Sequence, residues 1–121
     1  MNSASEAMAA WDADAFRRAG EAIDEELATA FEAAALLVEG AAKKLAPVRT
    51  GRLRASITHR LQREALDIYA EVGTNVEYAT YVEEGTTRNK PHPFLAPALD
   101  ANRNAITDLI TNAIRKAAGD D

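Results

Sequence analysis

Residues 57–72 have the sequence ITHRLQREALDIYAEV, in which apolar and polar residues alternate in two short runs. In the first run, which begins at Ser56, one face carries Ile57, His59 and Leu61. In the second run, the inner face carries Leu66, Ile68, Ala70 and Val72. A period of two residues is typical of strands that turn one face to a core. Because a short polar turn joins the two runs, they predict an antiparallel hairpin.

A long helix is predicted before the hairpin. From Asp12 to Ala46 the larger apolar residues recur every three or four positions, and Ala, Glu and Leu are abundant. Asp12 or Asp14 can cap its start, and Pro47 ends it. About 30 helical residues span about 45 Å, which is more than a core of this size needs. The excess length is a candidate surface for a neighbouring molecule.

Two helices are predicted after the hairpin. Residues 76–84 have apolar side chains at helical spacing, and Gly85 ends this short helix. A final helix of about 20 residues follows Pro97, which suits a first turn. The order is α–β–β–α–α. The predicted fold class is therefore α+β: a small antiparallel β-sheet packed by a long N-terminal helix and a C-terminal helix.

The length of 121 residues fits one domain, and we expect a flexible N-terminus over 1–14 and a single α+β domain over 15–117. Apolar residues make up 47% of the chain, but alanine supplies 27 of them, so the core is modest. A modest core favours burial against further copies of the chain. No apolar run approaches the roughly 18 residues of a membrane span, and no secretion signal is visible, so we expect a soluble protein with no membrane partner.

The residues that carry chemistry are few, and we expect no catalytic site, no metal and no cofactor. The absence of cysteine excludes a disulfide scaffold, a thiolate zinc site and a cysteine nucleophile. His59 lies on a predicted strand face, where a half-buried structural imidazole is expected, and His92 lies in a proline-rich loop, solvated or at an interface. Ser56 lacks the strand–elbow–helix context of a nucleophile. The sequence therefore favours a protein that is not an enzyme.

Charge is concentrated in one basic segment. Residues 47–64 carry a net charge of +4, whereas residues 1–46 carry −5. The basic side chains are Arg49, Arg52, Arg54, Arg60 and Arg63. They could contact phosphates of a nucleic acid, although no aromatic residue lies between them for base stacking. Alternatively, they pair with the acidic helix or with an adjacent subunit.

Three stretches together resemble a known family. They are APVRTGRLRASI at 46–57, VGTNVEYATYVEEGT at 72–86 and PHPFLAPAL at 91–99. In order and spacing they are similar to segments of the tail-component family of long-tailed phages and prophages (gene-product-ten-like minor tail, neck or tail-completion proteins), over about residues 15–117. Two positions depart from the family pattern: Arg49 replaces an acidic or small polar residue, and Glu84 replaces an aromatic one.

The residues that match the family, with the neighbouring arginines, are the candidates for interaction: Arg49, Thr50, Gly51, Arg52, Leu53, Arg54, Ser56, Gly73, Tyr78, Tyr81, Glu83, Gly85, Thr86, Pro93, Phe94 and Pro97. We expect Thr50 to cap a turn and Gly51 to take a backbone conformation denied to other residues. Each tyrosine either closes the core over the hairpin or contacts a partner. Phe94 is expected to anchor its loop.

The resemblance implies a function in virion assembly. It implies a ring, for example a hexamer, at the junction of head and tail, where this chain would contact copies of itself, a head-closure or connector protein, and a tail terminator or tail-tube protein. DNA would pass through the ring. The location would be the neck or tail of the virion, and the host cytoplasm during assembly. The alternatives are a small nucleic-acid-binding protein that uses Arg49–Arg63, and a chromosomal domain adapted from a prophage.

Overall fold

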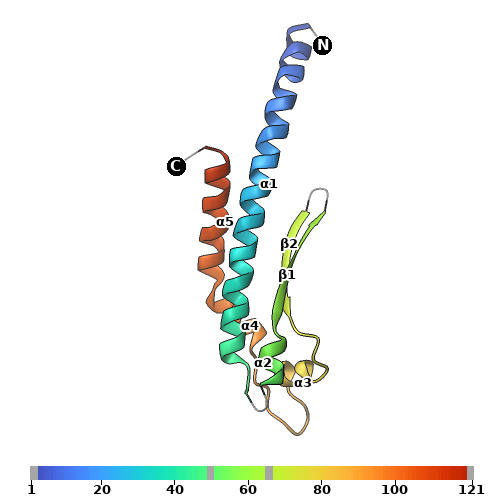
Figure 1. Ribbon diagram of the computed structural model, residues 1–121, viewed down its shortest axis with the longest axis vertical. Coiled ribbons are helices and arrows are strands. Elements are labelled where there is room, and N and C mark those ends of the chain that lie inside the picture. Colours follow the sequence, from blue (N-terminus) through green and yellow to red (C-terminus); the bar gives the residue numbers. More distant parts are fainter. Residues whose placement is uncertain (1–2, 49–50, 65–66, 120–121) are drawn as a thin grey trace.

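The computed structural model describes residues 3–48, 51–64 and 67–119, and the side chains of 24–48, 51–63 and 67–119. The elements in this part of the chain are α1 (Ser3–Leu45), α2 (Arg52–Ser56), β1 (Thr58–Glu64), β2 (Asp67–Gly73), α3 (Ala79–Glu84), α4 (Leu95–Ala101) and α5 (Arg103–Ala117) (Figure 1). The predicted α+β class is confirmed, because a two-stranded antiparallel sheet packs against the long N-terminal helix α1, and the C-terminal helix α5 packs against α1 as well.

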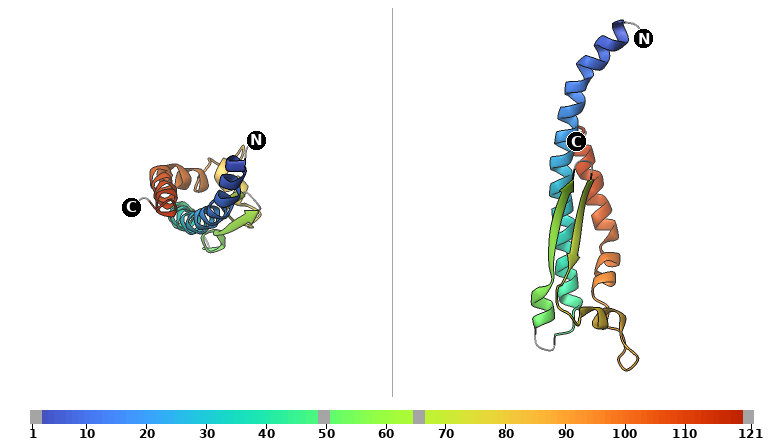
Figure 2. Two further views of the ribbon diagram at one scale, coloured as in Figure 1. Left: turned by 90° about the horizontal axis from the view of Figure 1, so that it is seen from above. Right: turned by 90° about the vertical axis from the view of Figure 1, so that its right-hand side faces the viewer.

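Helix α1 is the axis of the molecule. It has 43 residues and therefore spans about 65 Å. It begins at Ser3, so the predicted start near Asp12 is wrong. Helix α5 runs along one side of α1 and the hairpin along another, and the N-terminal part of α1 extends beyond both (Figure 2). The expected flexibility of residues 1–14 and the domain boundaries stay predictions.

The hairpin has the predicted antiparallel pairing. Its register runs from Thr58 opposite Gly73 to Glu64 opposite Asp67. The alternation over β2 is confirmed, since residues 67, 69 and 71 are exposed while residues 68, 70 and 72 are half-buried. The first strand starts later than predicted, because Ser56 belongs to α2. The predicted turn at 65–66, with Leu66, lies outside the described residues.

The remaining helices differ from the prediction in their bounds. Helix α3 ends before Gly85 as predicted, but it begins at Ala79 rather than at 76. The single helix expected after Pro97 is two helices. Helix α4 already starts at Leu95, with Pro97 in its first turn. The helical conformation is interrupted at Asn102, before α5. Helix α2, with five residues, was not predicted.

The core lies at the C-terminal end of α1, where α2, α3 and α4 converge (Figure 1). Its largest fully buried side chains are Phe94 and Ile57. The buried residues of this cluster are Val38, Ala42, Ala46, Leu53, Ile57, Val76, Ala79, Phe94 and Ala98. These residues gather at one end of the molecule. Further along α1, between α5 and β2, apolar side chains line an open groove.

Candidate functional site

The motif residues of the described chain gather around α2, α3 and the loop before α4, next to the C-terminal end of α1 (Figure 1). Gly51 precedes α2 with φ of 80°, which is the left-handed conformation expected for it. Leu53, one position inside α2, is buried in the core. Arg49 and the predicted cap Thr50 lie outside the described residues.

A chain of hydrogen bonds links α2 to the segment after β2. The hydroxyl of Ser56 donates to the carbonyl oxygen of Leu53 at 2.7 Å. Since this uses the one proton of Ser56, the neighbouring Thr74 hydroxyl must donate to Ser56 Oγ. Thr74 Oγ1 in turn accepts the backbone N–H of Val76 at 3.1 Å. Ser56 therefore holds two segments together, and its hydroxyl is engaged in these hydrogen bonds rather than placed as a nucleophile.

Arg52 is held on the surface by the segment before α3. Its guanidinium donates two hydrogen bonds to the Glu77 carboxylate, at 3.2 and 3.1 Å. It also lies 5.6 Å from the centre of the Tyr78 ring, within cation–π range. The hydrogen bond to Glu77 raises the pKa of Arg52. The backbone of Glu77 and then the Arg52 guanidinium lower the pKa of the Glu77 carboxyl.

Glu83 caps a helix that is remote in the sequence. Its carboxylate accepts the backbone N–H groups of Phe94 at 3.0 Å, Leu95 at 2.9 Å and Ala96 at 3.2 Å. These are donors at the start of α4, which lack partners inside the helix. Burial acts to raise the pKa of Glu83, but the three N–H donors together lower it. Glu83 therefore fixes α3 to α4 as an ionised carboxylate.

The loop between these helices is closed by its own residues. Gly85 has φ of 78°, and a Cβ there would lie 2.8 Å from the backbone nitrogen of Pro91. The Thr86 hydroxyl accepts the backbone N–H groups of Arg88 and Asn89 at 3.2 and 3.1 Å. By contrast, Gly73 has open space around it and no left-handed φ, so its backbone does not require glycine.

The loop ends in the expected anchor. Phe94 follows the exposed Pro93 and is 0% exposed, which confirms that it pins the loop to the core. Pro97 is half-buried in the first turn of α4, where the missing N–H of proline is tolerated. Phe94 and Pro97 hold the fold and present little surface to a partner, whereas Pro93 is exposed.

The two tyrosines have different environments. Tyr78 is half-buried and packs against the core, whereas Tyr81 is 63% exposed. Beside Tyr81 is a hollow of about 470 Å³ between α2, α3 and the loop after it. Its lining residues are Pro47, Gly51, Leu53, Tyr78, Tyr81, Val82, Thr86, Asn89, Lys90 and His92. Tyr81 therefore leaves most of its side chain exposed at the edge of this hollow.

The arginines of the basic segment do not form one patch. Arg52 and the exposed Arg54 are on α2, while Arg60 and Arg63 follow β1 toward the opposite end of the hairpin (Figure 1). Two of them have carboxylate partners outside the acidic helix, and pairing with an adjacent subunit stays a prediction. Arg52 pairs with Glu77, and Arg60 pairs across the hairpin with Glu71 at 2.8 Å.

His59 has the structural environment predicted for it. Its side chain is 18% exposed and lies between two carboxylates of α1. Nε2 is 2.6 Å from Glu32, and Nδ1 is 3.4 Å from Glu39 without hydrogen-bond geometry. The hydrogen bond with Glu32 is the main cause of a raised pKa of His59, which burial opposes. In the described chain no group of three or more His, Asp or Glu side chains could hold a metal ion.

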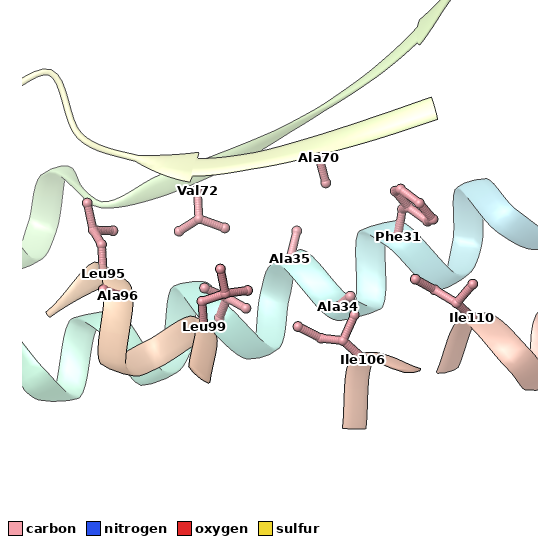
Figure 3. Close-up of a pocket in the computed structure, with 11 residues that line it drawn as sticks. Phe31, Ala34, Ala35, Ala70, Val72, Leu95, Ala96, Leu99, Ile106 and Ile110 are labelled. Carbon is pink, nitrogen blue, oxygen red and sulfur yellow. The ribbon is translucent and has the colours of Figure 1, made fainter. Parts of the chain in front are cut away.

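An open apolar groove that the sequence did not predict runs along α1. It lies between α4 and α5 on one side and β2 on the other, with α1 as its floor, and has a volume of about 450 Å³ (Figure 3). We call it the apolar groove. Its lining residues are Phe31, Ala34, Ala35, Val38, Ala70, Val72, Leu95, Ala96, Leu99, Ile106 and Ile110. The periodicity of the sequence identifies these residues as facing the core. It does not show that α1, α4, α5 and β2 leave them partly uncovered.

Comparison with known families identifies the chain. The family described as "Bacteriophage HK97-gp10, putative tail-component" matches residues 13–85, which is more than half of the chain. The chain belongs to this phage tail-component family. The match includes the stretch at 46–57 and all but the last residue of the stretch at 72–86, and it ends before the one at 91–99. No curated protein and no solved structure shows significant similarity to the chain.

Membership implies a structural component of the virion rather than a catalyst. The hydrogen bonds of the site agree with this role, since Glu83, Ser56 and Thr86 all bind backbone groups of their own chain. None of the helices in the described ranges has the length and hydropathy that crossing a membrane requires.

Proposed function

We propose that this tail-component protein is a neck or tail-completion protein that forms a ring at the junction of head and tail. The observation that carries the proposal is the apolar groove, an open surface lined by apolar side chains on a member of a phage tail-component family. Exposed apolar grooves can serve as protein–protein contact sites, so the groove supports a contact with another protein. We expect the ring to contain six copies.

The proposed mechanism is binding without chemistry. Copies add to one another through contacts that use two different surfaces of each subunit, and such contacts close into a ring when the rotation allows it. One face of the ring would bind a head-closure or connector protein, and the other a tail terminator or tail-tube protein. DNA would pass through the opening. Assembly would take place in the host cytoplasm before the protein becomes part of the virion.

Nucleic-acid binding through the basic segment receives less support. Arg52 and Arg60 have carboxylate partners within the chain, and the described arginines are spread from α2 to the far end of β1. A binder of duplex DNA concentrates its cations in one patch or stripe. Salt-dependent binding to duplex DNA in the absence of self-association would nevertheless favour this function over the ring.

The test of the proposal is the phenotype of a phage or induced prophage that lacks the gene. The proposal predicts DNA-filled heads and complete tails that are not joined, as seen by electron microscopy. A plasmid copy of the wild-type gene should restore joined particles. Normal infectious particles without the gene would contradict a role at the junction, and loss of heads or of tails alone would assign the protein to an earlier step.

A further inference from the structure

Positive charge is concentrated at the end of the molecule where α1 finishes. At this end α2, α3 and the loop before α4 lie together (Figure 1). We call it the basic tip and define it as residues 43–48, 51–56 and 74–94. The basic tip carries six basic and three acidic side chains, whereas the rest of the described side chains comprise five basic and nine acidic ones. A basic surface on an otherwise acidic protein favours an anionic partner.

Most cations of the basic tip have no anionic partner within the described chain. Arg52 pairs with Glu77, and the Glu83 carboxylate binds the N–H groups at the start of α4. Among the residues that the structure describes, the other five basic side chains of the tip form no ion pair: Lys43, Lys44, Arg54, Arg88 and Lys90. All but the half-buried Lys43 are exposed. Because the exposed Glu84 is the one carboxylate that remains, the tip keeps a clear excess of positive charge.

The hollow of about 470 Å³ beside Tyr81 lies within this basic surface. Leu53, Tyr78 and Val82 give its lining an apolar part, and Lys90 adds a cation. Tyr81 leaves 63% of its surface exposed at the same place. Tyrosine is enriched among the residues that contribute most to binding at protein interfaces. A partner that fits this hollow therefore supplies a large apolar side chain with carboxylates beside it.

The loop that carries Lys90 is held in place by hydrogen bonds of its own chain. The backbone N–H of His92 donates to the carbonyl oxygen of Val82 at 2.8 Å, which ties the loop to α3. The backbone N–H of Thr86 donates to the carbonyl oxygen of Asn89 at 2.9 Å, which closes the loop on itself. A surface that is ordered before binding loses less conformational entropy when a partner binds.

We propose that the basic tip binds an acidic segment of a different virion protein, and that a large apolar side chain of this segment enters the hollow beside Tyr81. This inference rests on the proposed function at the junction of head and tail and names the surface that meets the next component. The tip is one end of an elongated molecule (Figure 2), which suits a contact along the virion axis. Duplex DNA is also anionic, but its phosphates supply no apolar group for the hollow.

The test measures binding of the full-length chain to the purified head-closure protein and to the purified tail-terminator protein of the same phage, by biolayer interferometry. Two variants change the tip, Lys90→Glu and Tyr81→Ala. Their matched controls lie on the hairpin: Arg63→Glu makes the same change of charge at an exposed residue of β1, and Tyr69→Ala removes a tyrosine of β2 that is 37% exposed. Circular dichroism confirms that each variant is folded.

The proposal predicts that the wild type binds one of the two proteins. Lys90→Glu and Tyr81→Ala should each weaken this binding about tenfold or more, since one reverses a charge that faces carboxylates and the other removes the ring beside the hollow. The two hairpin controls should change it less than about twofold. Added salt should weaken binding of the wild type more than binding of Lys90→Glu, because salt screens the attraction between exposed charges.

The outcomes separate this contact from the proposed function. Binding that neither tip variant weakens, or binding of neither protein, would overturn the contact, whereas only normal infectious particles without the gene would overturn the function at the junction. If the tip variants instead weaken self-association in sedimentation velocity, a second copy occupies the tip and the contact with a different protein is wrong. If they weaken binding to duplex DNA while no protein binds, the tip is a nucleic-acid site and the proposal is wrong as well.

Discussion

Replacing Glu83 by alanine should destabilise the protein through the start of α4. The carboxylate is the acceptor for three backbone N–H groups, at 2.9 to 3.2 Å. Two of the donors belong to residues that are at least partly exposed, so water can replace the carboxylate there. Phe94 is fully buried, and an unsatisfied buried donor costs about 1–3 kcal/mol. Loss of a helix cap costs about 1 kcal/mol more, so we expect a loss of about 2–4 kcal/mol in the free energy of unfolding.

Urea denaturation followed by circular dichroism measures this loss, with Glu84→Ala as the control. Glu84 is the exposed neighbour on the same helix, and its replacement should change the free energy of unfolding by no more than about 0.5 kcal/mol. The lowered pKa of Glu83 adds a second signature. Its contribution is present above the ordinary pKa of 4.5 and is lost as the pH falls through the lower pKa of the folded state. Equal stability of the two variants at pH 7 would refute the capping role.

Three further predictions follow from the structure. Because the pKa of His59 is raised, its contact with the two carboxylates stabilises the fold fully below pH 6.5, and this stabilisation is lost as the pH rises through the raised pKa. The difference in free energy of unfolding between wild type and His59→Gln should therefore shrink as the pH rises. A difference that does not change with pH would contradict this. Gly85→Ala should cost about 1–3 kcal/mol because of the left-handed φ and the contact with Pro91, whereas Gly73→Ala should cost little, and equal losses in denaturation would be inconsistent with the loop geometry. Ile68→Ala should cost about 1–2 kcal/mol, less than for a fully buried isoleucine, because Ile68 is only half-buried; a loss near 4 kcal/mol on denaturation would show that the groove side of the hairpin is covered.

The hairpin and the long helix could be predicted from sequence because each has a clear period. The alternation from Asp67 to Val72 distinguishes two faces of a strand, and the same two faces differ in burial in the structure. The apolar spacing of three and four between Asp12 and Ala46 identifies a helix but is silent about residues 3–11, where alanine-rich sequence has no large apolar stripe.

The short helices could not be predicted in the same way. Helix α2 has five residues, so Leu53 is the one buried position and no period exists. The break between α4 and α5 is at Asn102, whose side chain donates to the carbonyl oxygen of Ala98 at 2.8 Å. Asparagine competes with the helix in this manner, but neither glycine nor proline marks the position.

Of the motif residues, the sequence predicted the left-handed Gly51 and the buried Phe94 but not the helix cap formed by Glu83. Matching Glu83, Gly85 and Phe94 to a family identifies them as important, but the distance in sequence between Glu83 and the start of α4 hides the cap. The groove was missed for a physical reason. Periodicity tells which residues avoid water, and only the arrangement of α1, α5 and β2 tells that they are left partly uncovered.

The most direct test of the proposed closed self-association is native mass spectrometry of the full-length chain, measured over a range of concentrations and with purified head-closure and tail-terminator proteins. The account predicts one dominant oligomer, with six copies expected, whose number does not change with concentration once the ring has formed. A chain that stays monomeric with and without its partners, or one that forms an open series of ever longer polymers, would contradict it.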